Sequence, residues 1–280
     1  MIRLGAPVFL DKHAKAAGAA ESHGADASDP EALVRAHIEK GYKAAYAPDL
    51  RIHETEKIRE VRRLFEAADI VIAEYGYWNN LMHPDEQTRK RYREGMLEAL
   101  AVAEELGARC AVGLAGSRRD YPVPTVHAAE NFEDDMFAEA VDLARWFIDM
   151  VKPKTAYFTY EIFPFSFLDS PEMIAELVRA VDRKQFGVHF DLVNLINCPR
   201  KYFRSGDLCR ECMRLFGDRI VSAHAKDIRL REPSISVILE EVMPGEGNLD
   251  IAANIRELHK LPQTVPYMIE HLSSEEEYDR

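Results

Sequence analysis

The stretch that decides the fold is Arg219 to Asp227, which reads Arg-Ile-Val-Ser-Ala-His-Ala-Lys-Asp. Its apolar residues predict a short buried strand whose carboxyl end carries a histidine, a lysine and an aspartate. Three other short apolar runs end in a carboxylate, and they are 155–161, 186–191 and 265–270. In a parallel barrel the carboxyl ends of the strands converge on one face, so we expect these polar side chains to lie together.

These four strand ends supply Glu161, Asp191, His224 and Glu270. One acid at the end of a strand has a simple structural explanation, because it can cap the next helix or pair with a nearby lysine. Four polar groups in succession, each about one β/α unit from the next, are harder to explain in that way. Three carboxylates and one imidazole are suitable ligands for a divalent metal ion. The sequence therefore predicts a site for one divalent cation.

The whole chain alternates between short apolar runs and longer amphipathic segments. We expect strands near 2–8, 42–47, 69–75, 109–114, 155–161, 186–191, 219–225 and 265–271. We expect helices near 30–40, 54–67, 85–107, 133–151, 171–182, 204–216 and 249–260, and the start of an eighth at 274–280. This alternation predicts a (β/α)8 TIM barrel, an α/β fold, with 1–280 as a single domain.

Two long loops interrupt the pattern, at about 9–29 and 228–248. The first is long enough to cover a site as a lid, and the alternative is a flexible insertion without a role. The rival fold is an open doubly wound sheet. It is disfavoured because no glycine-rich phosphate loop follows the first predicted strand.

The composition, 47% hydrophobic and 30% charged, is that of a globular protein with a sizeable core. A net charge of -12 repels phosphate backbones, so we expect no nucleic-acid partner. No apolar run is long enough to span a membrane and no signal-peptide pattern begins the sequence, which predicts a cytoplasmic location. Cys209 and Cys212 lie within a helical pattern without a second pair, so we expect the cysteines to be reduced thiols.

Several short motifs together carry a resemblance to a known family. They are Tyr160-Glu161, His189-Phe190-Asp191-Leu192-Val193-Asn194, His224-Ala225-Lys226-Asp227, Pro244-Gly245-Glu246-Gly247-Asn248-Leu249-Asp250 and Ile269-Glu270-His271-Leu272. Weaker matches are Leu4 to Val8 and Ala73 to Asn80. In this order and spacing, the sequence resembles the sugar phosphate isomerase/epimerase superfamily. These xylose-isomerase-like TIM barrels include the ketose 3-epimerases and the abasic-site endonucleases.

The resemblance implies that Glu161, Asp191, His224 and Glu270 bind one divalent cation, manganese or else magnesium, cobalt or zinc. It further implies that Glu161 and Glu270 are the acid/base pair of a ketose 3-epimerase. One of them removes a carbon-bound proton to give an enediolate, and the other returns a proton to the opposite face. The abasic-site endonucleases need three zinc ions, and their pattern has a histidine where this chain has Asn194. One metal therefore fits this chain better than three.

Further residues are candidates for substrate binding. His189 lies two residues before the predicted ligand Asp191, so it points to the same side of its strand as that ligand. A core histidine that already has its hydrogen bonds is the structural alternative for His189. Lys226 and Asp227 either bind a substrate hydroxyl or steady His224. The remaining candidates lie at the mouth of the third strand or in the resembling motifs, and they are Glu74, Trp78, Asn194 and Glu246.

We therefore expect an isomerase or epimerase that depends on a divalent metal and abstracts a proton next to a carbonyl of a small sugar or glycoside. A close alternative uses the same base and metal for β-elimination from a 3-keto-glycoside. Alternatives from other classes are a metal-dependent nuclease and a non-catalytic sugar-binding barrel. Relatives by resemblance often form dimers or tetramers, and the sequence leaves open whether this chain is a monomer or such a homo-oligomer.

Overall fold

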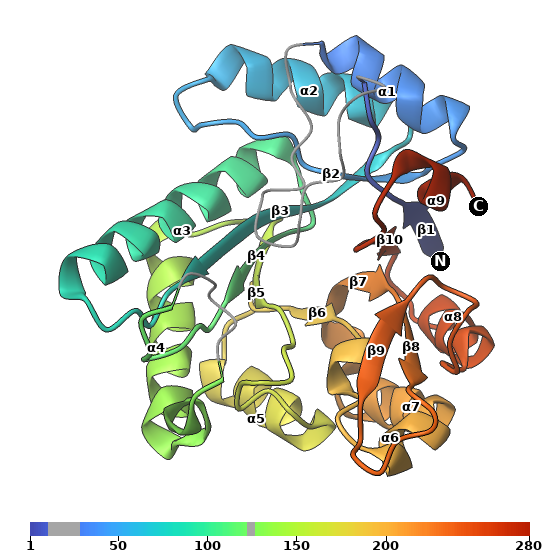
Figure 1. The fold of residues 1–280 in the computed structure, drawn as a ribbon. Coiled ribbons are helices and arrows are strands. Elements are labelled where there is room, and N and C mark those ends of the chain that lie inside the picture. Colours follow the sequence, from blue (N-terminus) through green and yellow to red (C-terminus); the bar gives the residue numbers. More distant parts are fainter. Residues whose placement is uncertain (11–28, 122–126) are drawn as a thin grey trace.

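Eight strands form one parallel sheet that curls into a barrel (Figure 1). The structure is a computed structural model that describes residues 1–10, 29–121 and 127–280. The barrel strands are β1 (Ile2–Gly5), β2 (Ala44–Tyr46), β3 (Val71–Asn80), β4 (Cys110–Leu114), β5 (Tyr157–Tyr160), β6 (Val188–Phe190), β7 (Ile220–Ala225) and β10 (Val265–Ile269).

The order of the strands around the sheet is β5-β4-β3-β2-β1-β10-β7-β6. The circle closes between β5 and β6 through two parallel bridges, which join Phe158 to Phe186 and Glu161 to His189. The predicted (β/α)8 TIM-barrel fold is therefore confirmed.

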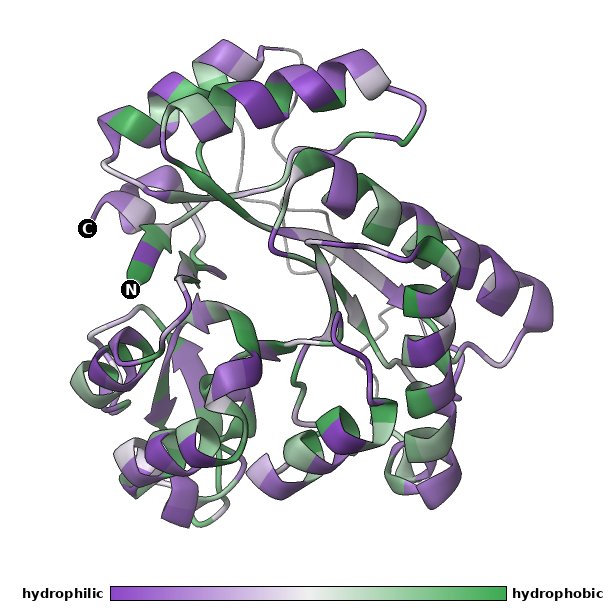
Figure 2. Ribbon diagram, turned by 180° about the vertical axis from the view of Figure 1, so that it is seen from behind, coloured by the Kyte–Doolittle hydropathy of each residue, from purple (hydrophilic) through white to green (hydrophobic). Residues whose placement is uncertain are grey.

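Helices surround the barrel and bury one side against it. They are α1 (Pro30–Glu39), α2 (Thr55–Ala67), α3 (Glu86–Leu106), α4 (Asp134–Val151), α5 (Pro171–Val181), α6 (Pro199–Phe203), α7 (Ser205–Phe216), α8 (Ile251–His259) and α9 (Glu275–Asp279). Three short 3-10 helices are Ala129–Phe132, Val193–Leu195 and Gly217–Arg219. Hydrophobic and hydrophilic residues occupy different sides of the long helices (Figure 2), as the amphipathic pattern predicts.

Local capping residues explain where several helices begin. In five of them the side chain before the first helical residue accepts a hydrogen bond from the backbone N–H three residues later, which satisfies a donor that the helix cannot use. These residues are Asp29, Asp85, Ser170, Asp250 and Ser274. The predicted helix boundaries agree with the structure to within two residues, apart from α6, which was not predicted.

The third strand is longer than predicted. We expected it near 69–75, but β3 continues to Asn80 because it pairs with β4 from Glu74 opposite Cys110 to Asn80 opposite Leu114. Glu74 therefore lies within the strand, and its expected place at the mouth of the strand is wrong. The side chain of Trp78 lies against Gly76, two residues earlier on the same strand.

The two predicted loops have different outcomes. The loop at about 228–248 contains an antiparallel hairpin of β8 (Asp227–Leu230) and β9 (Leu239–Val242), so it is more regular than expected. Most of the loop at about 9–29, and with it the lid, lies outside the described residues, which omit 11–28.

Two smaller predictions concern cysteines and membranes. Cys209 and Cys212 are buried on α7, and the described cysteines are all free thiols, as predicted. None of the helices that the structure describes is long and apolar enough to cross a membrane.

Candidate metal centre

The four predicted metal ligands lie at one end of the barrel on neighbouring strands. Glu161 follows β5, Asp191 follows β6, His224 lies near the end of β7 and Glu270 follows β10. Strand β7 pairs with both β6 and β10, and Glu161 bridges to β6, so the sheet itself brings the four residues together. Each side chain offers one ligand atom, and these atoms all lie within 4.8 Å of one another.

Three carboxylates point at one nitrogen of His224. Its Nδ1 atom lies 2.6 Å from Glu270 Oε1, 3.3 Å from Glu161 Oε1 and 3.8 Å from Asp191 Oδ2. All four residues are buried. Neither His224 Nδ1 nor Asp191 Oδ2 has a hydrogen-bond partner of good geometry in the described part of the chain. We call these four residues the ligand cage.

A buried lysine lies against the cage. Lys226 Nζ is 2.8 Å from Asp191 Oδ2 and 2.5 Å from Glu270 Oε1. Burial disfavours the ammonium, but Asp191 and Glu270 outweigh burial and raise the pKa of Lys226 well above its usual value. Burial also disfavours the Asp191 carboxylate, but Lys226 and His224 lower the pKa of Asp191 to about 2. His224 and Lys226 also lower the pKa of Glu270, against the effect of burial. Asp191 and Glu270 are therefore ionised at neutral pH.

The residues of the cage fit a divalent cation. Three oxygen donors and one imidazole nitrogen are a ligand set that magnesium, manganese, cobalt or zinc accepts. His224 Nδ1 and Asp191 Oδ2 are buried and have charged neighbours but no hydrogen bond of good geometry, and they are the atoms that a cation would contact. The carboxylates also outnumber the single ammonium beside them, so a cation would reduce the repulsion among buried negative charges.

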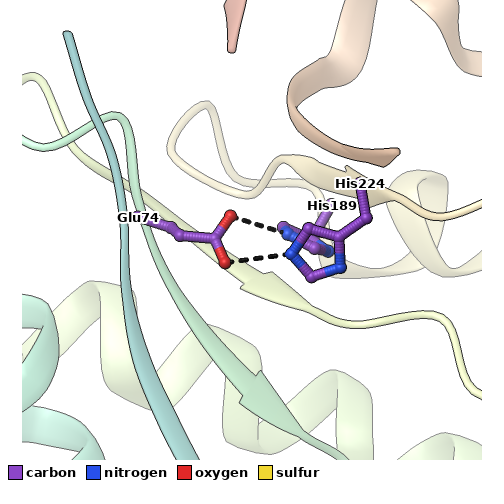
Figure 3. Close-up of side chains that lie close together, drawn as sticks. All are labelled: Glu74, His189 and His224. Carbon is purple, nitrogen blue, oxygen red and sulfur yellow. Dashed lines mark hydrogen bonds and ion pairs between the residues drawn. The ribbon is translucent and has the colours of Figure 1, made fainter. Parts of the chain in front are cut away.

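A second carboxylate system lies deeper in the barrel, next to the cage (Figure 3). Glu74 Oε1 is 3.1 Å from His224 Nε2, and Glu74 Oε2 is 2.8 Å from His189 Nε2. The hydroxyl of Ser222 donates a hydrogen bond of 2.9 Å to Glu74 Oε2. Burial opposes ionisation of Glu74, but the two imidazoles outweigh it and lower the pKa of this carboxyl.

The structure separates the other substrate-binding candidates into groups. His189 and Lys226 both lie beside the ligands, and for His189 its position in the strand predicted this. Asn194 is also close, because its Nδ2 lies 3.5 Å from Glu161 Oε1 and donates a hydrogen bond of 2.9 Å to Ile162 O. Trp78 is partly exposed and packs against a buried cluster of Cys110, Val112 and Val221.

Asp227 and Glu246 have other partners. Both carboxylate oxygens of Asp227 accept backbone hydrogen bonds, from Ile228 and Leu249 to Oδ1 and from Gly245 and Gly247 to Oδ2. This side chain therefore holds the loop after the β8–β9 hairpin. Glu246 is exposed on that loop, where its Oε1 lies 3.5 Å from Arg280 Nη2. The structure does not bring either carboxylate into the cage.

Sequence reasoning missed Ser222. This serine lies two residues before His224 and four before Lys226. Since alternate residues of a strand share one face, the run Ser-Ala-His-Ala-Lys already placed its hydroxyl on the side of the predicted ligands. The sequence could not show that Glu74 is the partner of this hydroxyl, because Glu74 lies on a distant strand.

Comparison with protein-family models matches residues 19–280 to the family described as the xylose isomerase-like TIM barrel. Comparison with curated proteins finds no significant match.

Several solved structures share the fold. One is a xylose isomerase-like TIM barrel protein from Mycobacterium smegmatis in complex with magnesium, with 15% identity and a TM-score of 0.64 over 90% of this chain and 84% of that chain. Another is 3-keto-D-glucoside 4-epimerase from E. coli, with 13% identity and a TM-score of 0.64 over 100% and 97% of the two chains. A third is D-psicose 3-epimerase in the presence of D-fructose, with 14% identity and a TM-score of 0.65 over 97% and 86%.

Proposed function

This chain belongs to the xylose isomerase-like TIM barrel family, and we propose that it is a sugar isomerase or epimerase that depends on a divalent metal ion. The reaction we propose is the transfer of a proton at a carbon next to a carbonyl. The substrate is a small sugar or a glycoside. The fold neighbours named as epimerases support this class of reaction, although at their low identity they show the shared fold alone.

The observation that carries the proposal is the approach of two glutamates, from different strands, to one imidazole nitrogen. Glu161 and Glu270 both reach His224 Nδ1, from strand ends that are not adjacent, since β6 and β7 lie between β5 and β10. Each carboxylate has a second oxygen that can take or hold a proton. Two bases that approach one point from different strands can remove a proton from one face of a substrate carbon and return a proton to the other.

The bound metal would polarise the substrate carbonyl and so acidify the neighbouring carbon. Glu161 and Glu270 then act as the proton acceptor and donor. The ammonium of Lys226, held by Asp191 and Glu270, is placed to attract a substrate oxygen beside the cage. Burial of the cage excludes water and strengthens these charge interactions. From the family resemblance we propose manganese as the metal, and the ligand set also accepts magnesium, cobalt or zinc.

The second candidate is β-elimination from a 3-keto-glycoside. Both reactions begin with the same proton abstraction.

The nuclease alternative has less support. The histidine of the endonuclease pattern is replaced by Asn194, whose amide donates to the Ile162 carbonyl. Among the described residues, both clusters of potential metal ligands contain His224, which fits one shared site better than three separate ions. A cytoplasmic location, a homo-oligomer and the lack of a nucleic-acid partner stay predictions.

The first experiment is incubation of candidate ketoses and 3-keto-glycosides with the metal-loaded protein in heavy water. Deuterium in the recovered sugar at the carbon next to the carbonyl supports isomerisation or epimerisation. Loss of the leaving group supports elimination. If no substrate of either class exchanges, epimerises or eliminates, the proposed function is wrong.

A metal titration tests the cofactor separately. The protein is stripped with a chelator, and its melting temperature is followed as manganese, magnesium, cobalt or zinc is added. A ligand that binds the native state at 100 times its dissociation constant adds about 2.7 kcal/mol, which is a shift of a few degrees. We expect the shift in wild type and not in His224→Ala. An equal shift in both proteins would place the metal elsewhere.

A further inference from the structure

We propose that Glu74 is a positioning residue, which keeps Nε2 of His224 and of His189 protonated and so turns the Nδ1 lone pair of His224 toward the metal. This inference rests on the metal site of the proposed function and extends it to a residue outside the cage. Figure 3 shows the arrangement, with one carboxylate reaching two imidazole rings.

The contacts define the chemistry of both rings. Glu74 is 1% exposed, and each of its oxygens lies within hydrogen-bond distance of one imidazole Nε2. A carboxylate accepts hydrogen bonds at both oxygens and donates none. Both rings must therefore supply a proton from Nε2. Ser222 is a third donor, so Glu74 Oε2 accepts hydrogen bonds from both His189 and Ser222.

The consequence for His224 is direct. An imidazole ligand binds a metal through an unprotonated nitrogen, and in a neutral ring a proton at Nε2 leaves Nδ1 with a lone pair. Nδ1 is the nitrogen that faces Glu161, Asp191 and Glu270. Glu74 thus selects the tautomer that the cage requires, and its negative charge makes the ring a stronger donor.

His189 is coupled to this arrangement through the shared carboxylate. Its ring meets that of His224 nearly edge to face, with centroids 4.2 Å apart and an angle of 79° between the planes. Its Nε2 lies 2.8 Å from the oxygen of Glu74 that His224 does not use. Because His189 occupies that oxygen and packs against the ring of His224, it limits rotation of both groups. His189 therefore supports the ligand and is not itself a member of the cage.

The test uses Glu74→Gln, which keeps the shape and removes the charge. An amide accepts on one side and donates on the other, so it cannot accept from both rings at once. We expect one of the two imidazoles to lose its Nε2 proton and the affinity for zinc or magnesium to fall by about 10 to 100-fold, as is typical when the hydrogen-bond partner of a metal ligand is changed.

The matched control is Ser222→Ala, which removes one donor to the same carboxylate and leaves both imidazole contacts.

Nitrogen-15 spectra of the histidines provide a readout that does not depend on activity. In wild type, with or without zinc, we expect a proton on Nε2 of both rings, and in Glu74→Gln on one. Zinc should shift the Nδ1 resonance of His224 in wild type and in Ser222→Ala. A wild-type ring protonated at Nδ1 alone would overturn the proposal, and so would Glu74→Gln with wild-type zinc affinity and an unchanged spectrum.

Failure of the role proposed for Glu74 can be distinguished from failure of the proposed function. If wild type binds no metal, the proposed function fails, while the metal-free spectrum still decides whether Glu74 holds the two protons. If Glu74→Gln does not fold, the wild-type spectra decide the proposal alone.

Discussion

Glu74 and the three carboxylates of the cage are buried side by side in this barrel, and they differ in how neighbouring groups compensate their negative charges. Glu74 has a hydrogen-bond donor at each oxygen and a third from Ser222. In the cage, Glu161, Asp191 and Glu270 all approach His224 Nδ1, and Asp191 and Glu270 also contact the ammonium of Lys226. The first group is complete without a ligand, whereas the second brings like charges together.

This difference in charge compensation distinguishes a carboxylate that its neighbours already satisfy from the carboxylates of a binding site. Like charges at short range in a buried site raise the free energy of the folded state unless a counter-charge enters. Proteins tolerate that cost where a ligand supplies the counter-charge, so incomplete compensation is itself a sign of function. The comparison therefore predicts that changes in the cage, or in Glu74 that holds its histidine, alter metal binding, and that changes to completed carboxylates away from the cage alter stability alone.

The largest effect is expected from removing a catalytic carboxylate. Glu161→Gln and Glu270→Gln keep the shape of the side chain and lose the proton acceptor, and we expect turnover to fall by about 10² to 10⁴-fold or more. Steady-state kinetics on the substrate found by deuterium exchange measures the loss. Glu176→Gln on the exposed surface of α5 is the control and should be unchanged. Turnover within threefold of wild type in both cage variants would assign the chemistry to other residues.

The next effect concerns the ammonium in the cage. Lys226→Met removes the counter-charge that Asp191 and Glu270 share, and we expect the metal-free protein to lose about 3 to 5 kcal/mol of unfolding free energy. A divalent cation replaces the lost charge, so manganese should raise the melting temperature of the variant by more than that of wild type. Thermal melts with and without metal measure both. Equal stability of the two metal-free proteins would show that the cage needs no counter-charge.

A smaller effect, on stability alone, is expected at Asp227. Its two oxygens accept four backbone hydrogen bonds, and Asp227→Asn places an amide donor against backbone donors. We expect a loss of about 1 to 3 kcal/mol with metal affinity unchanged. Gly247→Ala tests the same loop, because its Cβ would overlap the Asp227 carboxylate and the Ile228 carbonyl. Denaturant unfolding measures stability and metal titration measures affinity for the metal. Weaker metal binding in Asp227→Asn would show that Asp227 takes part in the functional site.

The sequence predicted what depends on local pattern. The strand ends that carry Glu161, Asp191, His224 and Glu270 are visible as short apolar runs followed by a polar residue, and the barrel topology then brings them together. The alternation of a strand was also enough to place His189 on the side of the ligands.

The sequence could not predict what depends on distant partners. The stretch after Tyr75 contains Gly76 and two asparagines and is typical of a loop, but pairing with β4 extends the strand through it. Glu74 is thereby buried inside the barrel. In the same way, Asp227 lies three residues after the predicted ligand His224 in sequence. A loop that returns some twenty residues later nevertheless donates hydrogen bonds to both of its carboxylate oxygens.

The smallest predicted effect is a pH dependence at a completed carboxylate outside the cage. Glu104 accepts hydrogen bonds of 3.0 and 2.8 Å from the backbone N–H groups of Thr155 and Ala156, at the start of β5. Burial raises the pKa of Glu104, but these bonds outweigh burial and lower it. A carboxyl with a lowered pKa in the folded state stabilises the protein above its unfolded pKa of about 4.3, and that stability is lost as the pH falls through the folded value. We expect Glu104→Gln to be less stable than wild type by about 1 kcal/mol at pH 7, and the difference in melting temperature should shrink below pH 4. Because Glu104 is complete without a ligand, saturating metal should leave that difference unchanged. A difference that is constant from pH 7 to pH 3 would show that the charge of Glu104 contributes nothing, and one that responds to metal would link the two ends of the barrel.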